Sequence, residues 1–234
     1  MDYNFILEHL NSLANSKNVE GMSRFGINPN NTLGISMPEI RKLAKAIKKN
    51  HSLALQLWDS GIHEARILAC LIAEKKELTQ ETMNKWVNEI DSWDICDQVS
   101  GNLFIKTKFY KEFIFDCAID EKEFVRRTAF SMIAYSAVHH KKLNDTEFLD
   151  YLPLFIKFCT DERNFVKKAV NWAIRQIGKR SMYLNGKMIV FCESLIQNNS
   201  DSKSAKWIAK SALRELKSEK TIEIISKRKN KFAK

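Results

Sequence analysis

Glycine and proline are scarce in this chain, which has 7 glycines and 3 prolines among its 234 residues. Average usage would give roughly 16 glycines and 12 prolines. Because β sandwiches and α/β enzymes need many turns built from these residues, their scarcity favours an all-α fold. Long apolar runs are missing as well, since a clean run at residues 67–73 is far too short to span a bilayer.

Cysteine motifs are also absent. The five cysteines are an odd number and no two lie closer than 21 residues, which excludes a CxxC zinc or redox motif. The sequence also lacks GxxxxGK[ST], GxGxxG and HExxH. We therefore expect no metal and no cofactor. Residues 1–18 resemble an amphipathic helix and not a signal peptide, so we expect a cytoplasmic protein with no membrane association.

The histidines offer no strong catalytic or metal site. His139 and His140 are adjacent, so they point to different helix faces and make a poor metal pair. His63 and Glu64 begin an apolar-periodic segment, where we predict a helix cap and a surface pair in place of a catalytic dyad.

Positive charge is concentrated in the C-terminal half of the chain. The formal net charge is +10; residues 1–117 carry 14 Lys and Arg against 15 Asp and Glu, and residues 118–234 carry 24 against 13. Residues 220–234 form a basic tail with six basic residues and one acid. A one-sided basic field predicts a polyanionic partner, most commonly nucleic acid, although a solvated basic surface is the alternative.

Apolar residues recur at helical spacing nearly throughout, and no segment alternates strictly with a period of two. Ser36, followed by Met37, Pro38 and Glu39, predicts a capping box at one helix start. No linker rich in serine or glycine interrupts the helices, so we predict a single domain over residues 1–234. The predicted helices cover residues 2–16, 19–25, 37–49, 51–60, 63–75, 79–90, 92–104, 106–118, 121–138, 145–159, 162–178, 181–198, 202–216 and 218–229.

Three segments of the chain resemble one another at regular intervals. Residues 120–130 align with residues 161–171, 41 residues later, and residues 201–211 follow after another 40. A period of this size built from two helices is typical of HEAT and armadillo repeats. Such pairs stack into an α-α superhelix with a concave face, so we predict that the aligned helices of successive repeats line one surface. With the basic charge of this half of the chain, we expect this concave face to bind DNA. Helices 63–75 and 92–104 should extend that row.

Aromatic and carboxylate side chains share faces of two of these helices. Trp93 and Asp97 are four residues apart, and Trp172 follows Lys168 by four in an aligned helix. An aromatic ring offers a flat face to a sugar or base, and a carboxylate can stabilise a developing cation. The structural alternative is that the tryptophans belong to the core and that Asp97 complements the helix dipole.

Basic residues occupy matching places in two repeats. Arg126 and Arg127 align with Lys167 and Lys168. Because an arginine can grip phosphate through two parallel hydrogen bonds, these positions predict DNA contacts, with ordinary surface charge as the alternative. The spacing leaves open whether Arg126 or Arg127 faces the ligand.

Taken together, these segments resemble the DNA alkylation repair proteins of the AlkD type, which are HEAT-like bacterial DNA glycosylases. The resemblance covers nearly the whole chain. It is carried by residues 33–41 (LGISMPEIR), 57–59 (LWD), 63–66 (HEAR), 92–97 (SWDICD), 124–129 (FVRRTA) and 165–175 (FVKKAVNWAIR).

The resemblance implies a role for several residues. The Trp and Asp of the family's W-D-x-x-D stretch match Trp93 and Asp97, its active-site Arg matches Arg127, and its second aromatic matches Trp172. One position departs from the pattern. Where the best-studied branch of the family has a Tyr in an N-terminal M-[AS]-R-Y stretch, this chain has Phe25, which keeps the ring and loses the hydroxyl.

The resemblance also implies an activity: hydrolysis of the N-glycosidic bond of purines alkylated at ring nitrogen three or seven, by a monomer acting on duplex DNA without a base-flipping pocket. A cationic base leaves without a general acid, and Asp97 would stabilise the oxocarbenium-like sugar. Trp93 and Trp172 would hold the sugar and backbone as further catalytic residues. The predicted DNA-binding residues are Arg127, Arg126, Lys167, Lys168, Arg175 and Phe25.

Two other functions stay open at this point. A HEAT-repeat scaffold could bind DNA or a protein partner without catalysis. Alternatively, the basic residues 227–231 could attach the chain to RNA or the ribosome through non-specific contacts.

Overall fold

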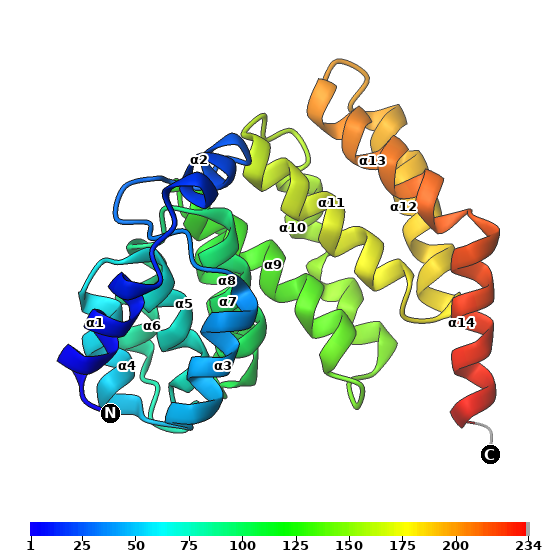
Figure 1. Ribbon diagram of the computed structural model, residues 1–234. Helices are drawn as coiled ribbons and strands as arrows, with labels where there is room; N and C mark the ends of the chain where they lie inside the picture. Colours follow the sequence, from blue (N-terminus) through cyan, green and yellow to red (C-terminus); the bar gives the residue numbers. More distant parts are fainter. Residues whose placement is uncertain (233–234) are drawn as a thin grey trace. The chain divides into compact units, whose positions relative to one another are not determined.

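The computed structural model describes the backbone of residues 1–232 and the side chains up to Lys227. All regular structure within these residues is helical (Figure 1), so the all-α prediction is confirmed. The α-helices are α1 (Tyr3–Ser12), α2 (Ser16–Arg24), α3 (Met37–Ile47), α4 (His51–Asp59), α5 (His63–Ile72), α6 (Gln80–Asn88), α7 (Trp93–Asn102), α8 (Tyr110–Ile119), α9 (Glu123–His139), α10 (Leu152–Phe158), α11 (Asn164–Gly178), α12 (Met182–Asn198), α13 (Lys203–Leu216) and α14 (Glu219–Phe232). Two 3₁₀ helices accompany them, η1 (Phe104–Lys106) and η2 (Asp145–Tyr151).

The predicted helix over residues 145–159 is divided in the structure. It begins as η2, and α10 follows with Pro153 in its first turn. Proline has no backbone N–H to donate to the carbonyl four residues earlier, so a continuous α-helix is interrupted there, while the first turn of a new helix accommodates it. A capping box formed by Asn144 and Glu147 starts η2.

The capping box predicted at Ser36 is wrong in one respect. Ser36 precedes α3 as expected, but its side chain makes no capping hydrogen bond. Pro38 in the first turn is the feature that marks this start. At the start of α6, by contrast, the side chain does cap the helix, since the Thr79 hydroxyl accepts from the Thr82 N–H at 3.1 Å.

Contacts between Cα atoms divide the chain into two compact units, Met1–Phe113 and Ile114–Lys234. In the first unit α5 lies at the centre and packs against α3, α4 and α7. Most of its side chains are buried, which explains why residues 67–73 are apolar without interruption. Beside it, Trp58 stacks on Trp86 with ring centroids 4.2 Å apart.

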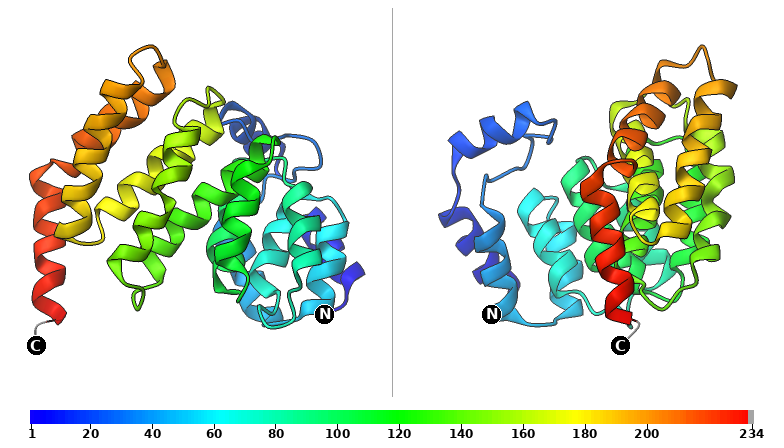
Figure 2. Two further views of the ribbon diagram at one scale, coloured as in Figure 1. Left: turned by 180° about the vertical axis from the view of Figure 1, so that it is seen from behind. Right: turned by 90° about the vertical axis from the view of Figure 1, so that its right-hand side faces the viewer.

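The second unit is built from repeated helix pairs. Helix α9 packs on α11, and α11 packs on α13, with α12 against both α11 and α13. The green, yellow and orange helices of Figures 1 and 2 follow one another in this order. These three helices start just after the aspartates that align in sequence, at positions 120, 161 and 201, so the repeat predicted from the sequence is confirmed in this unit.

Neighbouring repeats are joined by hydrogen bonds of one kind, from a backbone N–H at a helix start to a glutamate of the preceding repeat. The Glu123 carboxylate accepts from the Phe165 N–H at 3.1 Å, and the Glu162 carboxylate accepts from the Ser204 N–H at 3.2 Å. Each bond satisfies an N–H in the first turn of the next helix, where no intrahelical acceptor exists. Neighbouring repeats therefore contact each other through hydrogen bonds at the helix starts as well as through apolar packing.

Two other predictions concern the chain as a whole. The single domain over residues 1–234 stays a prediction. The basic tail predicted at residues 220–234 lies in α14 as far as Phe232; residues 233–234, and the side chains from residue 228 onward, lie outside the described residues.

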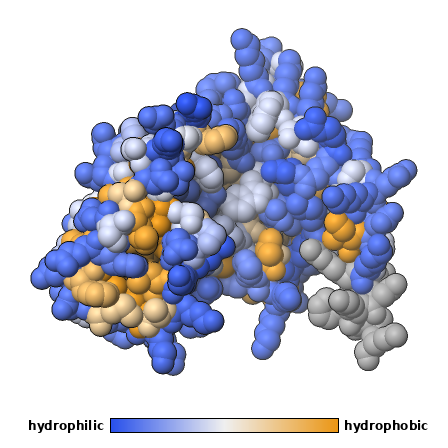
Figure 3. Space-filling model, viewed as in Figure 1, coloured by the Kyte–Doolittle hydropathy of each residue, from blue (hydrophilic) through white to orange (hydrophobic). Residues whose placement is uncertain are grey.

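On the face seen in Figure 3, apolar residues gather on the first unit and hydrophilic residues cover most of the second.

Candidate DNA-binding site

Helix α7 carries the predicted aromatic and carboxylate. Its buried side consists of Ile95, Cys96 and Val99, which pack into the first unit. Trp93 and Asp97 lie one turn apart on another side and are both half-buried. The i, i+4 spacing has therefore placed an indole and a carboxylate next to each other at the edge of the core.

A hydrogen bond from α2 fixes the indole. Trp93 Nε1 donates to the backbone carbonyl of Phe25 at 3.1 Å, and Phe25 is the residue that ends α2. The Phe25 ring itself is 76% exposed. Phe25 thus orients Trp93 through its backbone, and the missing tyrosine hydroxyl plays no part in that contact.

The loop after α2 is tied to the start of α7. The Asn28 N–H donates to Ser92 Oγ at 3.0 Å, and the Asn28 amide donates to Asp91 at 2.7 Å. Ser92 is fully buried at this point. These bonds hold the loop against the residue that precedes Trp93.

Glu64 anchors the far end of the same loop. Its carboxylate is fully buried and accepts backbone N–H groups from Leu33, Gly34 and Ile35 at 2.8, 2.7 and 3.1 Å. Gly34 has a φ of +77°, a conformation that favours glycine. Three convergent N–H groups compensate the burial of one carboxylate.

His63 is buried beside Glu64 and reaches α7. Its Nε2 lies 2.8 Å from Asp94 Oδ2. Burial by itself would lower the pKa of His63, but the hydrogen bond and charge of Asp94, with the charges of Glu64 and Asp91, raise this pKa above its ordinary value. The prediction of a surface pair at His63 and Glu64 is wrong, since their exposed fractions are 3% and 0%. The sequence shows two polar residues at a helix start, but it does not show the groups that hydrogen-bond to them in the interior.

In the second unit, the two predicted arginines on α9 have different environments. Arg127 is 5% exposed, and its Nη1 donates to the Phe165 carbonyl at 2.9 Å. Phe165 also packs on Phe124, with ring centroids 5.4 Å apart. Arg126 instead donates to Asp161 at 2.7 Å and lies over the Phe158 ring.

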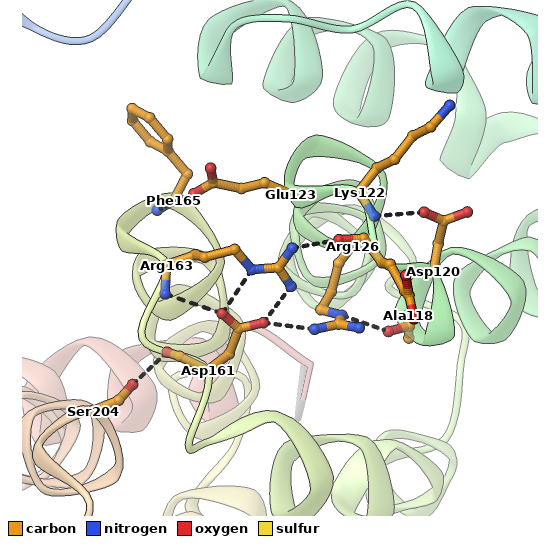
Figure 4. Close-up of polar contacts among 10 residues, drawn as sticks. Ala118, Asp120, Lys122, Glu123, Arg126, Asp161, Arg163, Phe165 and Ser204 are labelled. Atoms are coloured by element: carbon orange, nitrogen blue, oxygen red, sulfur yellow. Dashed lines mark hydrogen bonds and ion pairs between the residues drawn. The ribbon is translucent and has the colours of Figure 1, made fainter.

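Asp161 gathers a cluster of cations between neighbouring repeats. Arg163 Nε donates to one of its carboxylate oxygens at 2.9 Å, and Arg126 donates to the other (Figure 4). Burial alone would raise the pKa of Asp161, but the hydrogen bonds from Arg163 and Arg126 lower it to about 2. The guanidinium of Arg126 is therefore held by an internal carboxylate.

Trp172 lies on α11 and is half-buried. Its ring and the Tyr135 ring form an edge-to-face pair, with centroids 5.0 Å apart and planes at 81°. Tyr135 in turn stacks on His139. This edge-to-face packing fixes the orientation of the indole.

The remaining predicted cations also belong to the second unit. Lys167 Nζ lies 5.5 Å from the centroid of the Trp207 ring, and Lys168 is exposed. Arg175 forms an ion pair with Glu215, which also accepts from Lys179 at 2.6 Å. Of the nine predicted site residues, the first unit contains Phe25, Trp93 and Asp97, and the second contains Arg126, Arg127, Lys167, Lys168, Trp172 and Arg175.

Trp207 is a residue that the sequence analysis did not select. It lies on α13 with 42% of its surface exposed. The aligned repeats did contain a signal, because Trp207 occupies the place taken by Arg126 and Lys167 in the two preceding repeats.

Two kinds of feature are absent from the described part of the chain. It contains no group of three or more His, Cys, Asp or Glu side chains placed to hold a metal ion. None of its helices has both the length and the apolar character needed to cross a membrane.

Comparison with known proteins identifies a family and a similar fold. A family model described as DNA alkylation repair enzyme matches residues 6–217. A solved structure described as "A new family of proteins related to the HEAT-like repeat DNA glycosylases with affinity for branched DNA structures" superposes with a TM-score of 0.74 and 16% identity, covering 82% of this chain and 83% of that one. An engineered protein matches with a TM-score of 0.38 and 15% identity, over 76% of this chain and 90% of that one. No curated protein matches. The HEAT-like fold predicted from the repeats is thereby confirmed.

Proposed function

Because the chain belongs to the DNA alkylation repair enzyme family, we propose that it removes cationic alkylated purines from duplex DNA by hydrolysing their N-glycosidic bonds. The substrates would be purines alkylated at ring nitrogen three or seven. The observation that carries this proposal is the pairing of Trp93 with Asp97 on one side of α7.

The chemistry requires little beyond a carboxylate near the sugar. As the bond between C1′ and the base nitrogen breaks, its electron pair neutralises the cationic base, which leaves without a proton donor. Positive charge then develops on the sugar, and the Asp97 carboxylate stabilises it. Water adds to C1′, and its proton passes to the carboxylate or to solvent.

Each of two aromatic side chains suits contact with a deoxyribose. Trp93 is fixed by the Phe25 carbonyl, and the ring of Trp172 is fixed by Tyr135. A ring held in one orientation presents its electron-rich face to the polarised C–H groups of a deoxyribose at little entropic cost.

The basic residues suit contact with the backbone. Residues 118–234 carry 24 Lys and Arg against 13 Asp and Glu, and Lys168 is exposed on α11. Arg127, which matches the active-site Arg of the family and is 5% exposed, is proposed as the phosphate clamp. Binding should therefore weaken steeply as salt concentration rises.

The test is base release from methylated duplex DNA at low salt, with Asp97→Asn beside the unaltered protein. We expect the variant to release alkylpurine at least about a hundredfold more slowly, since the charge that stabilises the transition state is lost. Its affinity for duplex should change little. Asp116→Asn, which removes an exposed carboxylate from α8, is the matched control and should release base normally.

Two outcomes would contradict the proposal. Equal rates for Asp97→Asn and the unaltered protein would remove Asp97 from the reaction. Duplex binding without base release by either protein would indicate a DNA-binding member of the family with no glycosylase activity. The same preparations should then be compared on branched DNA, for which the family of the solved structure described above has affinity.

A further inference from the structure

One face of α13 carries an exposed tryptophan among basic residues. We call Lys203, Lys206, Trp207, Lys210 and Arg214 the α13 stripe. Their spacing of three, four and seven residues places them along one side of the helix. Trp207 is 42% exposed, and the four cations are exposed or half-buried.

The other face of α13 is a conventional core face. Ala205, Ile208, Ala209 and Ala212 are fully buried there. The helix therefore packs into the core without burying Trp207 fully. An indole directed to solvent instead leaves a large apolar ring available for contact with a ligand.

A lysine of the neighbouring repeat lies against the same ring. Lys167 Nζ on α11 is 5.5 Å from the centroid of the Trp207 ring. Lys167 and Trp207 occupy equivalent places in the two repeats, 40 residues apart. An ammonium group at this distance is placed to reach a phosphate of a nucleotide whose base meets the indole.

Within the stripe itself no acidic residue offsets this charge. No Asp or Glu occurs between Lys203 and Arg214. Of the nearest carboxylates, Glu215 pairs with Arg175, while Asp201, two residues before the stripe, and Glu162, which accepts the Ser204 N–H, are exposed near its N-terminal end. The stripe therefore presents positive charge and one aromatic ring to a polyanion.

We infer that the α13 stripe binds unpaired nucleotides of DNA, with Trp207 stacking on a base and the surrounding lysines contacting phosphates. The inference rests on the proposed function only in taking DNA as the polyanion. Phosphate contacts alone would not need an exposed indole. The bases of an intact duplex are stacked on one another, whereas an unpaired base offers a free face to an aromatic ring.

The test compares unmodified DNA in two forms by fluorescence anisotropy of a labelled oligonucleotide. The full chain is titrated into a single strand of roughly 16 nucleotides and into the duplex of the same length. For Trp207→Ala we expect the Kd for the single strand to rise by roughly five- to a hundredfold, the range that loss of one base–aromatic stack gives. The Kd for duplex should rise less than about twofold. Trp207→Phe should keep most of the single-strand affinity, because it retains a ring.

Tyr183→Ala is the matched control. Tyr183 is 49% exposed on α12, and Lys187 Nζ lies 5.6 Å from its ring, so it is the same kind of aromatic–lysine pair outside the stripe. Its removal should leave both Kd values unchanged. Circular dichroism of each variant checks folding. If Trp207→Ala does not fold, the double variant Lys206→Ala, Lys210→Ala takes its place and should lower the slope of log Kd against log salt for the single strand by about 1.5.

Two results would overturn the inference. The first is unchanged single-strand binding by Trp207→Ala, which would be expected if the stripe bound a protein partner. The second is an equal loss of affinity for the single strand and for the duplex. The oligonucleotides carry no lesion, so failure of base release cannot produce either result. Conversely, Asp97→Asn, the variant that tests the proposed reaction, should bind the single strand with unchanged affinity. The two proposals can therefore fail independently.

Discussion

His63 Nε2 lies 2.8 Å from Asp94 Oδ2, and this contact joins α5 to the first turn of α7 inside the first unit. Asp94 follows Trp93 directly, so a buried pair supports the backbone from which the indole projects. Only 3% of the His63 side chain and 18% of the Asp94 side chain are exposed. The pair is thus positioned to link protonation of a histidine with the stability of α7.

The stability of the chain should fall as pH rises through the range in which His63 loses its proton. The carboxylates of Asp94, Glu64 and Asp91 raise the pKa of His63 above its ordinary value, although burial opposes them. The folded state therefore binds this proton more tightly than the unfolded state. The contribution is fully present below the ordinary histidine pKa of about 6.5 and is lost as pH rises through the raised pKa. Urea unfolding at about pH 6 and about pH 8.5 measures it.

Asp94→Asn provides the control for this titration. The amide can still hydrogen-bond to His63, but it has no charge to hold the proton. The variant should lose most of the difference in unfolding free energy between the two pH values. The same pH dependence in the variant and the unaltered protein would mean that another group is responsible.

His63 and Glu64 also show which features of the structure could be predicted from the sequence and which could not. The helix start at this point was predictable from apolar spacing, and so was the shared face of Trp93 and Asp97 on α7. Burial of His63 was not predictable, because Asp94 lies 31 residues away and its proximity depends on how α5 packs on α7. Helical periodicity reports the faces of one helix; the partner of a polar residue is fixed by tertiary packing.

Gly34→Ala should destabilise the first unit by about 2 kcal/mol or more. Gly34 has a φ of +77°, and a Cβ there would lie 2.2 Å from the Asn15 carbonyl oxygen. The loop would have to move, which disturbs the N–H groups held by Glu64. Thermal unfolding measures the loss.

Gly21→Ala is the matched substitution for this experiment. Gly21 lies inside α2, and a Cβ there meets nothing within 4 Å. Alanine should stabilise the helix by about 0.5 to 1 kcal/mol. Equal effects of the two substitutions would show that the left-handed backbone and the contact with Asn15 do not matter.

The repeats were the most predictable part of the fold. One aligned position shows that the alignment does not predict the partner of a side chain. Residues 120–130, 161–171 and 201–211 align in sequence, and α9, α11 and α13 start where that alignment places them. The alignment equates Arg126 with Lys167, yet the first binds Asp161 and the second lies against Trp207. Equivalent backbone positions share a face, but the partner on the next helix decides what the side chain does.

Asp161→Asn should remove a pH-dependent part of the stability of the second unit. Hydrogen bonds from Arg163 and Arg126 lower the pKa of Asp161 to about 2, so the charged carboxylate contributes stability that is fully present above the ordinary aspartate pKa of about 3.9 and is lost as pH falls through about 2. With allowance for solvent screening, we expect the variant to be about 1 to 2 kcal/mol less stable at neutral pH. The difference should shrink as the pH of chemical unfolding is lowered toward about 3. Asp201→Asn is the control, because the aligned Asp201 of the next repeat is exposed, so this variant should change the stability at neutral pH little. A constant difference between Asp161→Asn and the unaltered protein at all pH values would mean that the side chain stabilises by packing and not by its charge.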